Sequence, residues 1–190
     1  MRALVLYAHP NPESYGAALH AAVVETLKEK GHIVDDCDLY GESFQPVLTR
    51  DERIGYHAVP ENIVPVADYV RRVRDAEMLV VVTPIWNFGW PAILKGFFDR
   101  VFLPGVSFDL HEGKVSGALT NIKRVVFVTT YGASRFRAFM VGDPPRKIAT
   151  RVLRGVTGFK ASIVYCAHYD MNRSTDRSRA AFLAEIRQRL

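Results

Sequence analysis

The sequence has little cysteine and no long hydrophobic segment. Only two of its 190 residues are cysteine, Cys37 and Cys166, and neither has the spacing of a metal site. Both lie in expected strands, the second and the fifth, so we expect buried free thiols in a reducing compartment, which indicates a cytoplasmic protein. No run reaches the roughly 18 apolar residues that a membrane-spanning helix needs. No signal-peptide pattern opens the chain. We therefore expect neither membrane insertion nor secretion.

Several motifs of catalysis and nucleotide binding are also missing. The glycine spacing of the dinucleotide fingerprint and the Walker loop does not occur, which disfavours a nicotinamide-binding Rossmann domain and an ATPase. No nucleophile elbow and no Ser-His-Asp arrangement can be identified, which disfavours a hydrolase. A phosphate-binding site in this chain must therefore use other residues.

Positive charge is concentrated in the last third of the chain. The formal net charge is +5, and residues 135–190 contain 12 lysines and arginines against 4 aspartates and glutamates. These basic residues are spread over helical segments without a nucleic-acid recognition motif, so we expect no nucleic-acid partner. Two interpretations remain: a solvated basic surface, or a patch that meets the phosphates of NAD(P)H, the ADP part of FAD or an acidic partner.

Apolar runs alternate with helical patterns along the whole chain, which predicts one domain spanning residues 1–190. Strands alternating with helices imply an α/β three-layer sandwich around a parallel sheet. Five strands of this length match the flavodoxin-like order 2-1-3-4-5. Two loops, residues 40–63 and 104–123, are long enough to be functional or interfacial. The expected strands are 3–8, 33–39, 78–83, 124–130 and 162–167, and the expected helices are 15–30, 65–74, 92–103, 146–156 and 175–189.

Ligands of such a sheet bind beyond the carboxyl ends of strands one, three and four. After the first strand, His9-Pro-Asn-Pro-Glu-Ser14 leads into a helix whose start is capped by the serine hydroxyl. Unpaired N–H groups and the positive end of the helix dipole suit a phosphate there. A loop that opens with His9 and carries the Ser14 hydroxyl is therefore the candidate phosphate site.

The loops after the third and fourth strands suit a flat aromatic ligand. Pro84-Ile85-Trp86-Asn87-Phe88 is followed by a glycine and the second tryptophan, Trp90, so large flat side chains gather at the mouth of the sheet. Thr129-Thr130-Tyr131-Gly132 offers hydroxyls and small residues at the neighbouring strand end. An isoalloxazine ring needs such an apolar wall and such polar groups along its edge. The three loops together predict a flavin.

The sequence resembles the flavodoxin-like NAD(P)H:quinone oxidoreductases, a family that includes potassium-efflux ancillary flavoproteins and drug-activity modulators. The resemblance covers about two thirds of the chain. It is carried by His9-Pro-x-Pro-x-Ser14-Tyr15, Asp38-Leu39-Tyr40, Phe44-x-Pro46, Pro84-Ile85-Trp86-x-Phe88-Gly89-x-Pro91-Ala92-x-Leu94-Lys95-Gly96-Phe97-Phe98-Asp99-Arg100-Val101-Phe102 and Thr129-Thr130-x-Gly132.

The resemblance implies a tightly held FMN or FAD and a homodimer with active sites at its interface. It assigns the flavin phosphates to His9, Ser14, Tyr15, Gly16 and Ala17, and the ring to the stretches Pro84–Phe88 and Thr129–Gly132. It places Asp109 and His111 over the partner's flavin, whereas a solvated pair in a loop is the plainer interpretation.

The chain departs from the family pattern at three places. Gly16 stands where many members have asparagine, and Tyr131 replaces a small residue, usually glycine. A tyrosine and a histidine that relatives carry downstream of Tyr131 are absent. Arg135 or Arg137 either stabilises an anionic reduced flavin in their place or is an ordinary surface arginine.

These observations predict an NAD(P)H-dependent flavoprotein oxidoreductase that reduces quinones or similar small acceptors by two electrons, with one site used twice in a ping-pong cycle. Phe88, with Trp86, is expected to form the wall of the site, and Tyr131 is expected to border the acceptor. Two alternatives stay open. One is a regulatory flavoprotein subunit of a cation-efflux transporter. The other is a flavodoxin-type electron carrier, which the basic charge disfavours.

Overall fold

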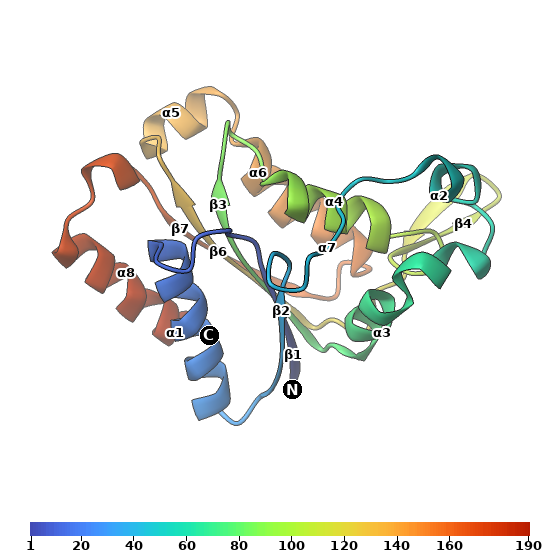
Figure 1. Ribbon diagram of the computed structural model, residues 1–190, viewed down its shortest axis with the longest axis horizontal. Coiled ribbons are helices and arrows are strands. Elements are labelled where there is room, and N and C mark those ends of the chain that lie inside the picture. Colours follow the sequence, from blue (N-terminus) through green and yellow to red (C-terminus); the bar gives the residue numbers. More distant parts are fainter.

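The computed structural model describes residues 1–190 and has a five-stranded parallel sheet between two layers of helices (Figure 1). The strand order is β2-β1-β3-β6-β7, which confirms the predicted order 2-1-3-4-5. The central strand β3 is buried along its whole length. That is the reason for its apolar run Met78–Val82. The strands are β1 (Arg2–Tyr7), β2 (Ile33–Asp38), β3 (Met78–Ile85), β6 (Arg124–Tyr131) and β7 (Ser162–His168).

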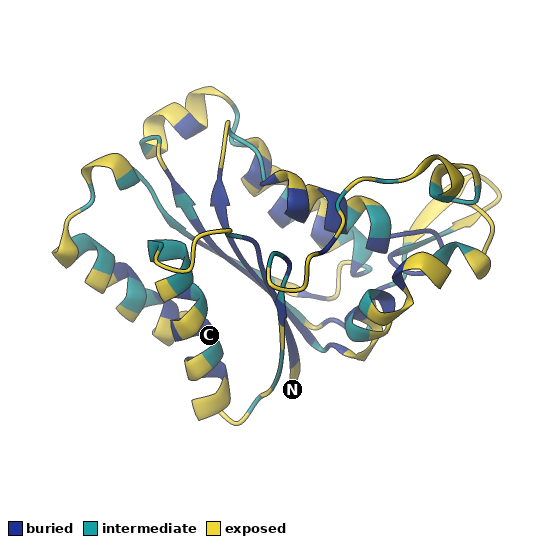
Figure 2. Cartoon of the chain, viewed as in Figure 1, coloured by how far each residue is buried: buried dark blue, intermediate teal, exposed yellow.

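Helices cover both faces of the sheet (Figures 1 and 2). The helices α1 (Tyr15–Glu29) and α8 (Asp176–Arg189) bury Leu19, Val23 and Phe182 against one face. The helices α3 (Ala67–Asp75) and α4 (Ala92–Val101) bury their apolar sides against the other face. A hydrophobic core lies on each face of the sheet. Successive side chains of β1 and β3 point alternately into one core and the other, because the side chains of a pleated strand alternate between its faces.

Local chemistry explains where the main helices begin and end. Ser14 caps α1 with a side chain that accepts from the Ala17 N–H, and Gly31, with φ of 76°, follows its last turn. Pro91 precedes α4. Gly96 in α4 is needed for packing, because a Cβ at this position would lie 2.2 Å from the Pro46 carbonyl oxygen.

The two long loops contain secondary structure that the sequence did not predict. Residues 104–123 include the hairpin β4 (Phe108–His111) and β5 (Lys114–Gly117), which is closed by a two-residue turn whose glycine has φ of 77°. Residues 40–63 include α2 (Arg50–Ile54), which starts in a capping box, and the beginning of the 3₁₀ helix η1 (Glu61–Val66). The tertiary fold thus stabilises elements too short to show in an apolar pattern.

The helix expected at 146–156 is divided in the structure. It consists of α6 (Pro144–Lys147), a π-helical segment η2 (Ile148–Val152) and α7 (Leu153–Val156). A further short helix, α5 (Arg135–Met140), follows β6, and a 3₁₀ turn η3 (Met171–Arg173) follows β7. None of the helices is both long and apolar enough to span a bilayer.

Candidate active site

Strand register brings the three predicted loops to one edge of the sheet. Thr83, Pro84 and Ile85 of β3 pair with Thr129, Thr130 and Tyr131 of β6. On the other side of β3, the Ala8 N–H donates to the Val82 carbonyl at 3.1 Å. The rings of His9 and Trp86 meet edge to face, with their centroids 5.9 Å apart. The loops after β1, β3 and β6 therefore lie together at one edge of the sheet.

The start of α1 has unused hydrogen-bond donors. Ser14 Oγ accepts from the Ala17 N–H at 3.1 Å, whereas the N–H groups of Tyr15 and Gly16 have no acceptor within the chain. The helix has 15 residues and carries no acidic residue in its first turn. Free donors at the positive end of such a helix attract an anion. The residues present fit a flavin phosphate.

His9 adds a further donor beside this helix start. The Asn11 N–H donates to His9 Nδ1 at 3.1 Å, so the neutral ring carries its proton on Nε2. Gly16 leaves room for that ring, because a Cβ at Gly16 would lie 3.3 Å from His9 Cδ2. Gly16 thus places no side chain between the helix start and the His9 ring.

The side chain of Tyr15 is engaged elsewhere. Its hydroxyl donates to the Arg179 carbonyl of α8 at 2.8 Å, and its ring packs edge-on against His168. Burial raises the pKa of Tyr15 to about 12, although Arg179 opposes the rise. Tyr15 therefore joins α1 to α8, and the backbone N–H is the group it offers to a ligand.

Residues Trp86–Gly89 form a tight turn with unusual backbone geometry. The N–H groups of Trp86 and Gly89 donate to each other's carbonyls, at 3.0 and 2.8 Å. The two central residues, Asn87 and Phe88, have φ of 49° and 57°. A left-handed conformation costs a non-glycine residue roughly 1–2 kcal/mol. Such strain is typical of functional sites. The turn exposes Trp86 (42%) and leaves Phe88 half-buried.

Not every residue of this segment faces outward. Pro84 and Ile85 belong to β3 and are buried, so a ligand can meet only their backbone. The prediction that both tryptophans lie at the mouth of the sheet is wrong for Trp90. Its half-buried ring packs against Phe98 and Phe127, with centroid distances of 4.9 and 5.7 Å, because the chain reverses direction at the turn and brings the ring against the hydrophobic core.

Tyr131 also lies differently from the expectation. Its side chain is 1% exposed and stacks on Tyr169, with ring centroids 4.6 Å apart. Its hydroxyl donates to Asp143 Oδ1 at 2.7 Å and lies 2.5 Å from the Tyr165 hydroxyl. Burial raises the pKa of Tyr131 strongly, and Tyr165 adds to the rise. The buried hydroxyl needs polar partners, and Asp143 and Tyr165 supply them. The side chain of Tyr131 therefore points into the protein and not toward the space where a quinone-like acceptor was expected.

The remaining candidates of this loop differ in accessibility. Thr129 is fully buried and Thr130 is half-buried. Gly132 is exposed and lines a pocket of about 170 Å³ together with Ser134, Arg137 and Asp170. Of the two arginines nominated by the sequence, Arg137 is therefore the one beside the loop predicted to meet the ring edge.

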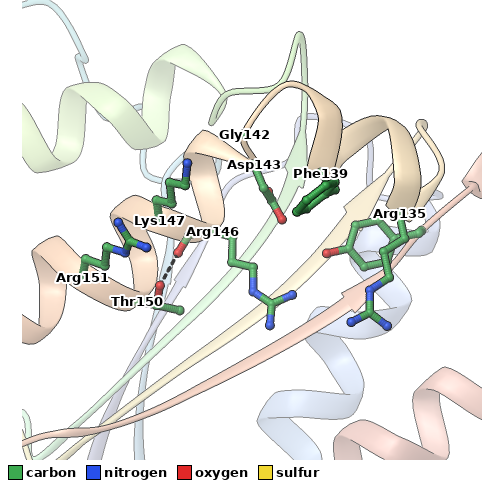
Figure 3. Close-up of a pocket in the computed structure, with 9 residues that line it drawn as sticks. Arg135, Phe139, Gly142, Asp143, Arg146, Lys147, Thr150 and Arg151 are labelled. Atoms are coloured by element: carbon green, nitrogen blue, oxygen red, sulfur yellow. Dashed lines mark hydrogen bonds between the residues drawn. The ribbon is translucent and has the colours of Figure 1, made fainter.

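A larger pocket, which the sequence did not identify, lies on the other side of α5 (Figure 3). It has a volume of about 500 Å³. Its lining includes Arg135, Asp143, Arg146, Lys147, Arg151 and Tyr169. The concentration of positive charge after residue 134 was the one signal for it in the sequence, but charge alone does not show which side chains converge.

Asp109 and His111 lie on β4 of the hairpin and not in an open loop. They line a separate pocket with His57 and Gly105, away from the loops after β1, β3 and β6. The chain contains no group of three or more His, Cys, Asp or Glu side chains that could hold a metal ion. Both cysteines are buried and unpaired by disulfide.

The fold and these loops define the class of protein. The family model of the flavodoxin-like fold matches residues 1–190, and the chain belongs to this family.

Relatives with known names are similar over most of the chain. NAD(P)H dehydrogenase (quinone) 1 of Cavia porcellus is 33% identical over an alignment 148 residues long, which covers 70% of this chain and 54% of the relative. An uncharacterized NAD(P)H oxidoreductase of Haemophilus influenzae is 33% identical over 132 residues, which make up 68% of this chain and 64% of the relative. The chain thus spans more than half, but less than two thirds, of the length of each of these two relatives.

A solved structure matches the chain along almost its full length. The crystal structure of Smu.1420 from Streptococcus mutans UA159 superposes with a TM-score of 0.86 at 30% identity, and the match covers 99% of this chain and 97% of that one. The two proteins therefore share one fold.

Proposed function

We propose that the chain is an NAD(P)H-dependent flavoprotein that reduces quinones or similar electron-poor acceptors by two electrons. The observation that carries the proposal is the meeting of three loops at one sheet edge: free N–H donors at α1, the strained aromatic turn after β3, and the exposed Gly132 after β6. The similarity to NAD(P)H dehydrogenase (quinone) 1 of Cavia porcellus supports the same activity.

In this proposal the flavin, FMN or FAD, is held by residues from two parts of the site. Its phosphate meets the N–H groups of Tyr15 and Gly16, the Ser14 region and His9 Nε2. Its ring meets the backbone of Pro84, Ile85, Thr129 and Thr130 and the segment Trp86–Phe88. When bound, a flavin supplies the hydride chemistry between a nicotinamide donor and a quinone.

The chain's own contribution is position and the exclusion of water. The side chains of Trp86 and Phe88 supply flat apolar surface against which donor and acceptor can lie in turn. Because Asn87 and Phe88 hold a left-handed backbone, that surface is fixed by the turn and not by a long flexible loop. Arg137, beside Gly132, offers positive charge toward the loop predicted to meet the ring.

We further propose a cytoplasmic homodimer, in line with the resemblance and with the two free cysteines. The exposed apolar side chains of α5, Phe136, Phe139 and Met140, favour a second candidate function, which is docking on a transporter's cytosolic domain as a regulatory flavoprotein.

The test is anaerobic stopped-flow reduction of the purified protein by NADH and NADPH, after its flavin has been released and identified. We expect rapid bleaching by at least one nucleotide and reoxidation by benzoquinone. A bound flavin that neither nucleotide reduces would support the regulatory function instead. Reduction in two resolved one-electron steps would support an electron carrier, and no flavin affinity would refute the site.

A further inference from the structure

The pocket between α5 and α6 contains four basic side chains that have no acidic partner. Arg135, Arg146, Lys147 and Arg151 line it, and none of them forms an ion pair within the chain. Figure 3 shows Arg146 and Arg135 extending to the same side of the pocket. Several cations around one pocket without counter-charges give it the positive potential of an anion site.

The one carboxylate of the pocket does not neutralise these cations. Asp143 Oδ1 accepts from the Tyr131 hydroxyl at 2.7 Å, and the residue is fixed in a left-handed conformation, with φ of 45°, at the start of α6. Asp143 is therefore committed to Tyr131. Four positive charges against one negative charge leave the pocket strongly cationic.

A hydroxyl in the pocket also lacks a partner. The Tyr169 hydroxyl is buried and makes no hydrogen bond within the chain. Buried polar groups are nearly always paired, so an orphaned donor beside a pocket points to a ligand or to bound water. Arg146 lies near this hydroxyl, since its guanidinium opposes the rise in the pKa of Tyr169 that burial causes. It also stacks over Tyr165, with 5.4 Å between its guanidinium carbon and the centroid of that ring.

The location connects the pocket with the candidate active site. Arg135 is the first residue of α5 and follows Gly132 by three positions, and Tyr169 directly follows β7. Tyr169 stacks on Tyr131, whose neighbours in the chain are Thr130 and Gly132. The pocket thus borders the same edge of the sheet at which a dinucleotide donor would present its nicotinamide.

The chemistry of the lining suits a phosphorylated adenosine. Arginine and lysine bind phosphate oxygens, arginine in a two-pronged geometry. The exposed ring of Phe139 offers an apolar surface for a base. A volume of about 500 Å³ is in the range of small-molecule sites.

We propose that this pocket binds the 2′-phosphorylated adenosine end of NADPH and so makes NADPH, and not NADH, the preferred electron donor. The inference rests on the proposed function, since it names the donor for the same site. An acidic protein segment is the alternative occupant, and the test below separates the two.

The first measurement is calorimetric titration of the protein with 2′,5′-ADP at about 0.15 M salt, with 5′-ADP and inorganic phosphate as comparison probes. It needs no turnover, so its result is independent of the proposed activity. We expect 2′,5′-ADP to bind at least tenfold more tightly than either comparison probe. Equal binding of all three would overturn the proposal, as would binding of polyglutamate without binding of 2′,5′-ADP.

The second measurement uses a double variant and a matched control. Lys147→Ala/Arg151→Ala removes two exposed pocket cations, and Lys160→Ala/Arg177→Ala removes two exposed cations elsewhere. The pocket variant is expected to weaken 2′,5′-ADP binding and raise the KM for NADPH at least tenfold, while the KM for NADH changes less than about twofold. Equal losses in both double variants would show bulk charge alone and would overturn the proposal.

Discussion

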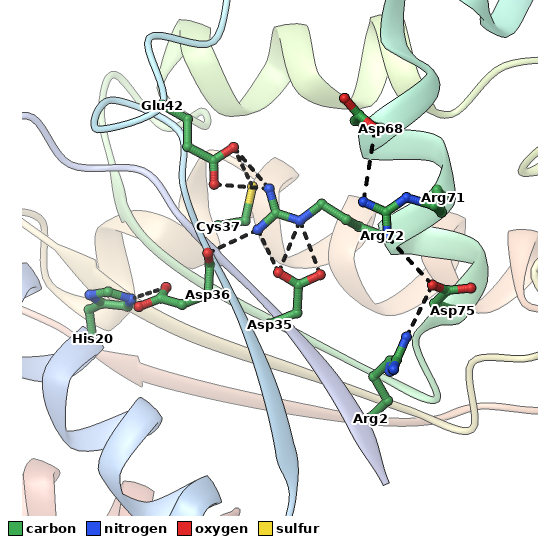
Figure 4. A network of polar contacts seen from close by, with 10 residues as sticks. All are labelled: Arg2, His20, Asp35, Asp36, Cys37, Glu42, Asp68, Arg71, Arg72 and Asp75. Atoms are coloured by element: carbon green, nitrogen blue, oxygen red, sulfur yellow. Dashed lines mark hydrogen bonds and ion pairs between the residues drawn. The ribbon is translucent and has the colours of Figure 1, made fainter.

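Arginine side chains have opposite surroundings in two regions of this molecule. On α3, Arg72 is 13% exposed and fully paired (Figure 4). Its guanidinium donates to Asp35 at 2.7 Å, to Glu42 at 2.9 Å and to the Asp36 carbonyl at 2.9 Å. In the α5–α6 pocket, Arg135, Arg146 and Arg151 have no carboxylate partner at all.

The comparison distinguishes arginines that stabilise the fold from arginines whose charge can bind a ligand. Arg72 joins α3 to β2 and satisfies two carboxylates, so its charge is already used within the fold. Such a saturated arginine has no donor left for a ligand. The pocket arginines have no carboxylate to occupy their donors. The first region should therefore govern stability, and the region around the strand ends should govern binding and turnover.

The largest expected effect on stability is that of Arg72→Ala. The change leaves Asp35 and Glu42 without their cation beside the buried Cys37. Loss of one partner from a partly buried network of this kind costs about 2 kcal/mol or more. Urea unfolding followed by circular dichroism measures the free energy of unfolding directly.

Arg151→Ala is the matched control for this change. Because Arg151 is exposed and unpaired, its loss should alter the free energy of unfolding by less than about 0.5 kcal/mol. If the two variants lose equal stability, the distinction between structural and available arginines does not hold.

Phe88→Ala should show the reverse pattern, with a large effect on turnover and a small one on folding. Removal of the ring takes away flat surface next to the proposed flavin, and we expect kcat/KM for benzoquinone to fall at least tenfold. The free energy of unfolding should fall by no more than about 1 kcal/mol, since the ring is only half-buried.

Phe159→Ala provides the control for that variant. Phe159 is also a phenylalanine with a left-handed backbone, with φ of 61°, but it precedes β7 and lies at the opposite end of the sheet. Its replacement should leave kcat/KM unchanged. Unchanged kinetics in Phe88→Ala would exclude Phe88 from the site.

The fold could be predicted because its signals are local and strong. The apolar run of β3 and the Ser14 cap of α1 each follow from neighbouring residues alone. The hairpin of β4 and β5 was not predicted, because its strands have only four residues each, which is too short for a recognisable apolar pattern. Short elements depend on the surface that they pack against.

Within the site, backbone positions were predictable and side-chain directions were not. His9 and Ser14 lie where the capped helix start requires them. Trp90 turns inward to pack on Phe127, which is distant in the sequence. Tyr131 turns inward because its hydroxyl donates to Asp143, which lies beyond α5 in the chain. No spacing rule within a single loop contains that information. The pocket between α5 and α6 was not predicted either, because its lining residues come from separate segments of the chain.

High pH should lower the free energy of unfolding through the buried Tyr165. Burial raises the pKa of Tyr165 to about 12, whereas an unfolded tyrosine ionises near 10. The raised value stabilises the fold fully below pH 10, and this contribution is lost as the pH rises from about 10 to about 12. In Tyr165→Phe, the fall in unfolding free energy between pH 8 and pH 11 should be about 1 kcal/mol smaller than in the unchanged protein. Equal falls in both proteins, measured by urea unfolding, would contradict the assignment.

The smallest expected effect concerns the helix start that the proposed flavin phosphate uses. In Gly16→Ala, the added Cβ would lie 3.3 Å from His9 Cδ2 and 3.4 Å from Ser14 Oγ, so the histidine ring must move. We expect the flavin dissociation constant, measured by fluorescence quenching, to rise about threefold. The free energy of unfolding should hold or increase, since alanine favours a helix over glycine by about 1 kcal/mol.

Gly155→Ala separates the two consequences of that substitution. Gly155 is also helical, and a Cβ there meets no atom within 4 Å, so this variant gains helix propensity without crowding any side chain. It should bind flavin as the unchanged protein does. If Gly16→Ala binds flavin equally well, the position of the His9 ring does not matter to the phosphate, and the anion site consists of the helix N–H groups alone.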